Sequence, residues 1–209
     1  MGRAPNAVSY ENTLGNLVLG ASYSFGGQPG SVSRDSYWGT RVTYKIGDLK
    51  VGAVYQSTRD DNNRQQQMWG AIGRYTVGPA NLFLGYLGGI DETGILDEAL
   101  NAPGRTVTSG SSVANPRRDA ILITGATYQV VPAVTVTGAL YAGRTRAVNG
   151  LPDNTGRRYT GVLLAEYALS AGTQLYGTVD YNKVSGGTVT ELPGTSNQTG
   201  VAVGIRHIF

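Results

Sequence analysis

The chain has no cysteine and only one histidine among its 209 residues. The absence of thiols excludes zinc fingers, thiolate chemistry and a disulfide framework, and one imidazole leaves little scope for acid–base catalysis. Charged residues make up 15% of the chain, against about 25% in an average soluble domain. Glycine is abundant, with 31 residues, roughly twice its usual share. This composition argues against an ordinary helical protein with a charged surface.

Long apolar runs are also missing. Stretches without polar side chains, such as residues 161–165, are only a few residues long, far short of the roughly 20 apolar residues that a spanning helix needs. The first residues, Met1–Pro5, lead into a mixed polar segment without the apolar core of a secretory signal. We therefore expect no spanning helix, and either the chain stays where it is made or its N-terminus is not the native one.

The net charge of +3 would permit nucleic-acid binding. The basic residues are scattered, however, and the adjacent pairs Arg117-Arg118 and Arg157-Arg158 form no cluster in the sequence. We predict no nucleic-acid partner. Tyrosine, in contrast, is frequent, with 13 residues against three Phe and two Trp. Rings with an apolar body and a polar tip suit a boundary between apolar and wet surroundings.

Apolar and polar residues alternate with period two along almost the whole chain, as in residues 17–25, which indicates half-buried strands. This pattern predicts an all-β chain with eleven strands. Their approximate ranges are 4–12, 17–26, 36–46, 49–58, 67–77, 81–90, 118–130, 134–146, 157–169, 173–184 and 199–209.

The connections between these strands alternate between short turns and long polar loops. The short turns contain Gly, Pro or Asn, which favour tight reversals. They lie at 13–16, 47–48, 78–80, 131–133 and 170–172, and the long loops lie near 27–35, 59–66, 91–117, 147–156 and 185–198. One end of the sheet therefore carries turns and the other carries loops, as in outer-membrane barrels. Residues 95–100 predict one helical turn within the longest loop, which we otherwise expect to be a surface excursion.

The tyrosines follow the same order. A tyrosine lies three residues before each short turn, and four others lie four to six residues beyond the leading leucine of the opposite strands. The first set is Tyr10, Tyr44, Tyr75, Tyr128 and Tyr167; the second is Tyr23, Tyr55, Tyr86 and Tyr181. Six to eight strand residues at a tilt near 45° separate the two rows by about 15–20 Å. We predict two aromatic girdles at the borders of a membrane.

A membrane explains this pattern because open sheet edges are not tolerated in hydrocarbon, so spanning strands close into a barrel. The sequence therefore predicts a transmembrane antiparallel up-and-down β-barrel with lipid outside and water inside. A soluble lipocalin-like barrel also alternates, with its apolar face inward. Alternation alone does not decide between the two, whereas the tyrosine rows and the turn and loop asymmetry favour lipid outside.

Polar residues of the opposite phase are the candidates for a water-filled interior. The predicted pore-lining residues are Arg41, Lys45, Lys50, Arg74, Glu166, Asp180, Asn182 and Arg206. Basic residues prevail among them. Because rings of fixed charge bias ion passage, we expect a modest preference for anions.

The end of the chain carries a more specific motif. Residues 203–209, Val-Gly-Ile-Arg-His-Ile-Phe, resemble the V-G-[LI]-R-H-x-F ending of Gram-negative general diffusion porins. Residues 167–176 resemble their penultimate hairpin, and Asn6–Tyr10 resembles the strand after their third loop. The resemblance implies an outer-membrane channel for passive diffusion of small hydrophilic solutes, homotrimeric when full length. It also implies that Phe209 is a signal for the barrel assembly machinery.

Such porins have about 16 strands, so the resemblance implies a C-terminal portion that lacks five strands and the third loop. An eleven-strand barrel would also need a parallel seam, whereas bacterial barrels have even strand numbers. We expect residues 1–209 to be one porin domain, incomplete at its N-terminus. The acidic half of the family's constriction belongs to the third loop and is expected to be absent.

Two other functions remain open. The long loops, above all 91–117, are candidates for an adhesin or receptor surface. A barrel hydrolase is less favoured because the single imidazole, His207, falls on the lipid-facing phase, and Asp60-Asp61 and Asp97-Glu98 are expected to be solvated loop residues. We predict no catalytic residue, no metal site and no cofactor.

Overall fold

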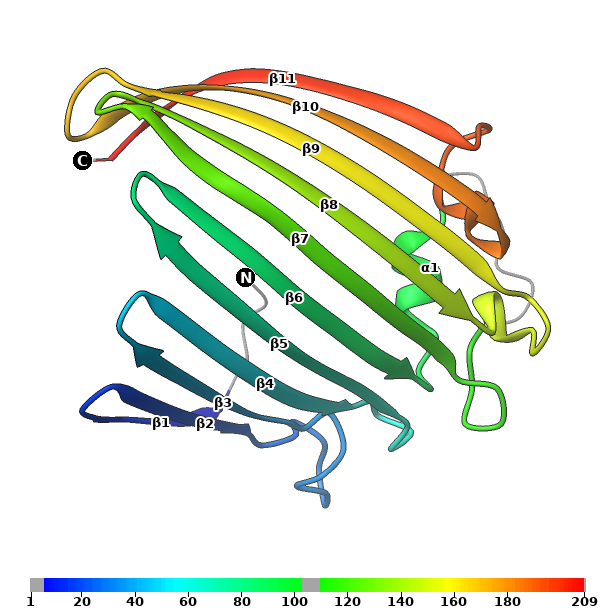
Figure 1. Cartoon of the computed structure of the whole chain (residues 1–209). Helices are drawn as coiled ribbons and strands as arrows, with labels where there is room; N and C mark the ends of the chain where they lie inside the picture. The colour runs from blue at the N-terminus through cyan, green and yellow to red at the C-terminus, as the bar shows by residue number, and fades with distance from the viewer. Residues whose placement is uncertain (1–5, 103–109, 209) are drawn as a thin grey trace.

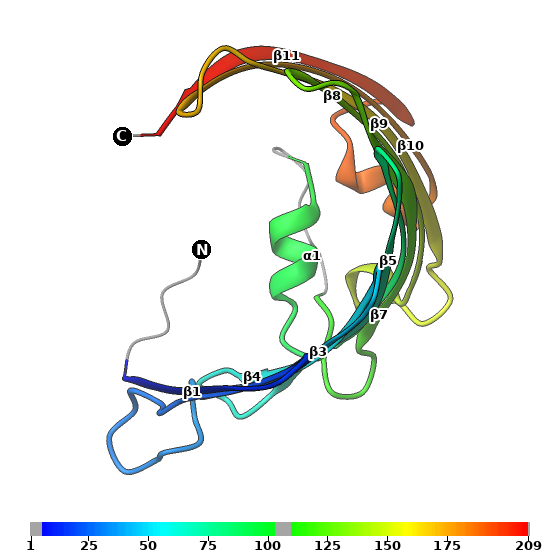
Figure 2. The same cartoon turned by 60° about the vertical axis from the view of Figure 1, so that its left-hand side comes forward.

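The computed structural model describes residues 6–102 and 110–208. In this part of the chain, eleven strands form one antiparallel sheet in chain order, which curves into an open trough (Figures 1 and 2). The strands are β1 (Ala7–Leu14), β2 (Leu17–Ser24), β3 (Tyr37–Ile46), β4 (Leu49–Arg59), β5 (Gln65–Val77), β6 (Ala80–Asp91), β7 (Arg117–Val131), β8 (Val134–Arg146), β9 (Gly156–Ala168), β10 (Thr173–Gly186) and β11 (Asn197–His207). The eleven predicted strands and their all-β, up-and-down order are confirmed.

The described strands form an open sheet and do not close into a ring. In the described residues, β1 pairs only with β2 and β11 pairs only with β10. In an antiparallel sheet in chain order, β1 and β11 run in the same direction, so a direct seam between them would be parallel. None of the helices in residues 6–102 and 110–208 is long or apolar enough to cross a bilayer.

Short turns join the strands at one end of the sheet and loops join them at the other, as Figure 1 shows. Three of the short turns place a glycine at positive φ: Gly15 at 61°, Gly47 at 55° and Gly78 at 53°. Only glycine adopts this conformation without strain from a Cβ atom, which explains why glycine occurs at these positions between the alternating segments.

The loop end carries the short helices. They are α1 (Ile95–Leu100) and the 3-10 turns η1 (Val148–Gly150) and η2 (Gly187–Glu191). The helical turn predicted at residues 95–100 is confirmed. The surface excursion expected for the longest loop does not hold for α1, which lies inside the trough (Figure 2).

Alternation gives the sheet two distinct faces. We call the side that α1 occupies the concave face and the opposite side the convex face. Arg117 of β7 contacts Asp97 of α1 and Glu191 of η2, so its phase of the strand is the concave one. Residues directly opposite each other on paired strands share a face. Asp91, which is opposite Arg117, is therefore on the concave face, and so is Thr145, which is opposite Asp119.

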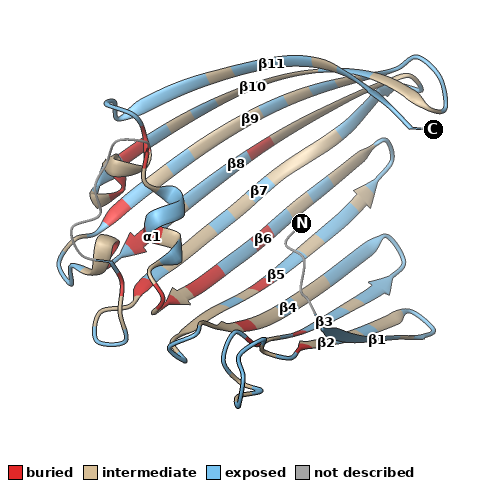
Figure 3. Cartoon of the chain, turned by 180° about the vertical axis from the view of Figure 1, so that it is seen from behind, coloured by how far each residue is buried: buried red, intermediate tan, exposed pale blue. Residues whose placement is uncertain are grey.

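The sheet has no conventional core. Among the described residues, the buried apolar side chains are Ala102, Ala139, Ala147, Val148, Val184 and Leu192. Figure 3 shows that most buried residues gather at the loop end, beneath α1. The convex face is exposed and apolar: Val201 is 72% and Val203 83% accessible. Such a surface needs an apolar medium to cover it.

Candidate functional site: the concave face

All eight residues predicted to line a pore lie on the concave face. Lys45 of β3 is opposite Lys50 of β4, which is opposite Arg74 of β5. At the other side of the trough, Asn182 accepts a hydrogen bond from Arg158, which also binds Glu191 of η2. The period of two then places the remainder on this face: Arg41 on β3, Glu166 on β9, Asp180 on β10 and, opposite Gln174, Arg206 on β11.

Lys45, Lys50 and Arg74 form a continuous row, which we call the basic row. The three side chains are exposed, and none makes an ion pair with a carboxylate in the described part of the chain. Like charges directly opposite one another repel, so the row is stabilised only by water and by anions from solution. It lies near the short-turn end, since Lys45 is followed closely by the turn at Gly47.

The other predicted charges have polar partners on the same face. Arg41 forms an ion pair with Glu11 across the first strands. Gln174 donates to Glu166 through Nε2 and Oε1 at 2.6 Å and accepts a hydrogen bond from Arg206. The basic row is the group of adjacent positive charges on the described concave face that forms no ion pair.

A second cluster at the loop end escapes sequence reasoning. Arg117 is only 2% exposed, and its guanidinium meets three carboxylates. It lies 3.2 Å from Asp97, 2.9 Å from Asp119 and 2.8 Å from Glu191. These groups come from α1, β7 and η2, and no spacing in the sequence connects them. We call this cluster the loop hub.

Asp97 corrects the expectation that the loop acids are solvated. Its side chain is fully buried, and Oδ2 accepts hydrogen bonds from the amide of Ser111 at 2.9 Å and from its hydroxyl at 2.6 Å. Oδ1 accepts from the amide of Asn149 at 3.1 Å and from Arg117. A buried carboxylate is tolerated when its lone pairs are satisfied in this way. Its neighbour Glu98 is exposed, as expected.

The loop hub joins three loops. Asn101 donates to Asn149 Oδ1 at 2.9 Å, which joins the β6–β7 loop to η1, and the amide of Ala102 donates to the carbonyl of Thr190 in η2 at 2.9 Å. Together with the ion pairs of Arg117, these bonds hold α1 over the concave face. The inward loop thus narrows the trough at its loop end.

The nine predicted girdle tyrosines all occupy the convex phase. Tyr75 lies opposite both Leu49 and Leu82, while Tyr55 and Tyr86 lie further along the same strands. Convex rings that the sequence reasoning did not assign are Tyr159, Trp38, which lies opposite Tyr23, and Trp69, which lies opposite Tyr55. Trp38 and Tyr55 pack with ring centroids 5.0 Å apart.

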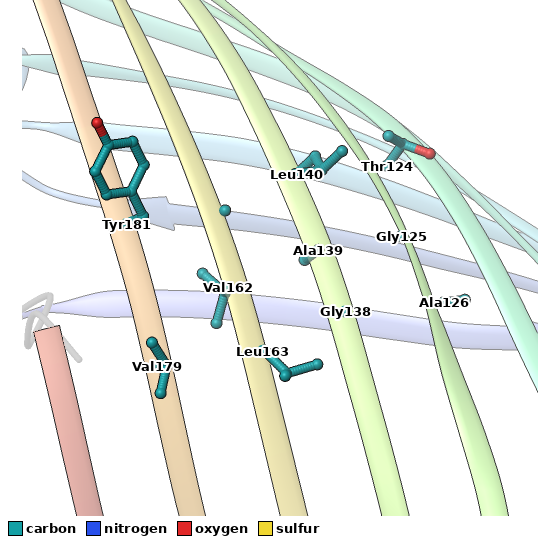
Figure 4. Close-up of a pocket in the computed structure, with 11 residues that line it drawn as sticks. Thr124, Gly125, Ala126, Gly138, Ala139, Leu140, Val162, Leu163, Val179 and Tyr181 are labelled. Carbon is teal, nitrogen blue, oxygen red and sulfur yellow. The ribbon is translucent and has the colours of Figure 1, made fainter. Parts of the chain in front are cut away.

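The convex face also has an apolar groove of about 590 Å³ across β7 to β10. Figure 4 shows Leu140, Leu163, Val179 and Tyr181 around the groove. Gly138 also lines it and leaves space there because it has no side chain. Almost all of its surface is carbon. The groove therefore suits hydrocarbon chains better than a polar substrate.

The predicted assembly signal, Phe209, lies outside the described residues. Close to it, His207 is on the convex phase, and its Nδ1 is 2.8 Å from the Thr173 hydroxyl. Within residues 6–102 and 110–208, no group of three or more His, Cys, Asp or Glu side chains is arranged to hold a metal ion.

Comparison with known proteins gives a consistent result. The profile of a family described as Gram-negative porin matches residues 1–187. A search of curated proteins found no match.

Several solved structures share the fold. An anion-selective porin from Comamonas acidovorans aligns with a TM-score of 0.74 at 21% identity, covering 99% of this chain and 60% of that one. A loop-deletion mutant of OmpT from Vibrio cholerae aligns with a TM-score of 0.72 at 15% identity, covering 96% and 62%. OmpF of Salmonella typhi, solved with daunomycin, gives 0.61 at 13% identity, covering 97% and 62%. The chain thus spans about three fifths of the length of these structures.

Proposed function

Because this chain belongs to the Gram-negative porin family, we propose that its concave face is the wall of a water-filled channel for passive diffusion of small hydrophilic solutes and ions, with a preference for anions. The protein is located in the outer membrane. Strands that face water on one side and lipid on the other need no apolar core, which fits a sheet with a polar concave face and an exposed apolar convex face.

The basic row carries the proposal of anion preference. Lys45, Lys50 and Arg74 project from neighbouring strands without a carboxylate partner in the described residues. Fixed positive charge on a pore wall raises the local concentration of anions. A neighbour in fold is described as an anion-selective porin, which supports the proposal.

The inward β6–β7 loop supplies a narrowing. The loop hub fixes α1 over the concave face, so solutes pass between this helix and the facing wall. The same placement gives little support to an adhesin, since the helix of the longest loop lies inside the trough.

The proposed partners follow from the two faces. Outer-membrane lipid covers the convex face, and small solutes pass the concave one. Because unpaired strand edges are not tolerated in hydrocarbon, β1 and β11 need strand partners in the membrane. Homotrimer formation and recognition of Phe209 by the barrel assembly machinery stay predictions.

The proposal is tested by refolding the purified chain in detergent and adding it to planar bilayers. We expect stepwise increases in conductance, and under a KCl gradient a reversal potential on the anion side. Insertion of a closed barrel without conductance steps would exclude a channel. A reversal potential on the cation side would exclude the role of the basic row while leaving the channel intact.

A further inference from the structure

Basic residues gather on the convex face at the loop end of β7 to β10. They are Arg118, Arg144, Arg146, Arg157 and Lys183, and all are exposed. Pairing brings them together: Arg118 is opposite Arg146, and Arg144 is opposite Arg157. The sequence showed only scattered residues, because they come from four strands. We call them the convex basic patch.

In the described part of the chain, none of the five patch residues forms an ion pair with a carboxylate. Every carboxylate within the eleven described strands lies on the concave face: Glu11, Asp91, Asp119, Glu166 and Asp180. The closest of these to the patch, Asp119, is held by Arg117 and Thr145. Directly opposed like charges are unfavourable in a sheet. Two such arginine pairs therefore point to anions supplied from outside.

The height of the patch matches that of lipid headgroups. Tyr86, Leu122, Ala142, Tyr159 and Lys183 form one lateral row on the convex face. Tyrosines of this kind mark the interface between the hydrocarbon and the headgroups. The arginines lie two or four residues further along their strands than this row, on the side of the loops. At about 3.3 Å per residue, they are roughly 7–13 Å from the row, measured along the strand. The loops of such barrels face outward from the cell.

A recess of about 340 Å³ lies within the patch. Arg118, Arg144 and Arg146 line it, together with Trp69, Tyr86, Ile90 and Asp119, whose carboxylate is bound by Arg117 and Thr145. Trp69 belongs to the same lateral row as Arg144, through Gly88 and Ala120. The recess thus presents guanidinium groups beside apolar rings, which are the contacts that a phosphate and the adjoining acyl chain require.

We propose that this recess binds a phosphorylated glycolipid of the outer leaflet, with its phosphates on Arg118, Arg144 and Arg146 and its acyl chains along the apolar convex face. The groove beneath Tyr181 continues this face towards the short-turn end. The site lies on the opposite side of the wall from the channel, and it does not depend on conduction.

Trp69 provides a direct measurement, because the chain has only two tryptophans. In a Trp38→Phe background, the refolded chain in non-ionic detergent is titrated with lipid A carrying brominated acyl chains, which quench nearby indole fluorescence. We expect saturable quenching of Trp69. The same lipid with its phosphates removed, and a brominated phosphatidylglycerol, should both quench much less at equal concentration.

The variant Arg118→Gln, Arg144→Gln, Arg146→Gln should weaken lipid A binding by about a hundredfold, since each basic residue near a lipid surface contributes about fivefold. Arg59→Gln is the matched control, because Arg59 is in the convex phase of β4 at the loop end, away from the recess. Replacing the three arginines with lysine should retain much of the binding, and far-UV circular dichroism shows whether each variant folds.

Equal quenching by lipid A and its dephosphorylated form would overturn the proposal, since hydrocarbon contact alone would then account for the signal. Equal binding of phosphatidylglycerol would also overturn it, because any anionic lipid surface would suffice. An unchanged affinity in the folded triple glutamine variant would exclude these arginines as the site. None of these results bears on conductance, so the channel proposal is tested separately.

Discussion

Arg117 and Arg118 are consecutive in β7 but act on opposite faces of the sheet. Arg117 is almost completely buried on the concave face, where it binds Asp97, Asp119 and Glu191. Arg118 is exposed on the convex face, directly opposite Arg146. One step along a strand thus separates the residue that fixes the inward loop from a residue that faces the membrane border.

Replacing Arg117 with Met should destabilise the loop end by about 3–5 kcal/mol, because removal of one partner leaves buried carboxylates uncompensated. Arg118→Met removes the same charge from an exposed position and should cost far less. Urea unfolding in detergent measures the difference, and limited proteolysis reports whether the β6–β7 loop has been released. Equal stability of the two variants would mean that the loop hub does not hold the loop.

The assignment of residues to faces could be predicted from the sequence because it depends on a period of two within each strand. Lys50 and Arg74 on one phase, and Tyr55 and Tyr75 on the other, are separated by the same local alternation in both β4 and β5. The turn glycines likewise mark their own positions. Which face is concave could not be derived from the alternation itself, since the curvature belongs to the whole sheet.

The loop hub and the convex basic patch could not be predicted, because their members meet only through strand register and loop folding. Glu191 reaches Arg117 from η2, across a long separation in the chain. Arg144 and Arg157 become neighbours only when β8 and β9 pair. Asp97 looks like an ordinary loop acid until α1 packs inside the trough. Closure was predicted only for a complete barrel, and the described strands by themselves leave the sheet open.

Arginine substitutions at Leu163 and at Leu164 should lower the stability of the folded chain in the membrane by different amounts, because the two residues lie on opposite faces. Leu163 is 57% exposed on the convex face, and a charge facing hydrocarbon near the middle of the membrane costs about 2–4 kcal/mol. Leu164 lies on the concave face opposite Thr137 and Thr178, where water reaches the new charge. Folding into lipid vesicles from urea measures both. A larger loss for Leu164→Arg would reverse the assignment of lipid and water to the faces.

Neutralising the basic row should reduce the preference for anions. In the variant Lys45→Gln, Lys50→Gln, Arg74→Gln, we expect the anion-to-cation permeability ratio to fall severalfold, since a unit charge about 4 Å away is worth about 1 kcal/mol even in water. Lys183→Gln, on the convex face, is the control and should leave the ratio unchanged. Reversal potentials in a salt gradient give the ratio. Raising the salt concentration should shrink the effect, because ions screen exposed charges.

Gly88 should be required for the position of Trp69. A Cβ atom at Gly88 would lie 2.4 Å from Nε1 and 2.5 Å from Cε2 of the indole, so Gly88→Ala must displace the ring from the recess. The loss in free energy of unfolding should be at the lower end of the roughly 1–3 kcal/mol seen for overpacking, because the ring can turn towards the lipid. Gly73→Ala is the control, since its added Cβ meets nothing closer than 4.0 Å. In a Trp38→Phe background, a shifted emission maximum for Gly88→Ala alone would establish the packing, whereas identical spectra would show that the indole does not lie over this glycine.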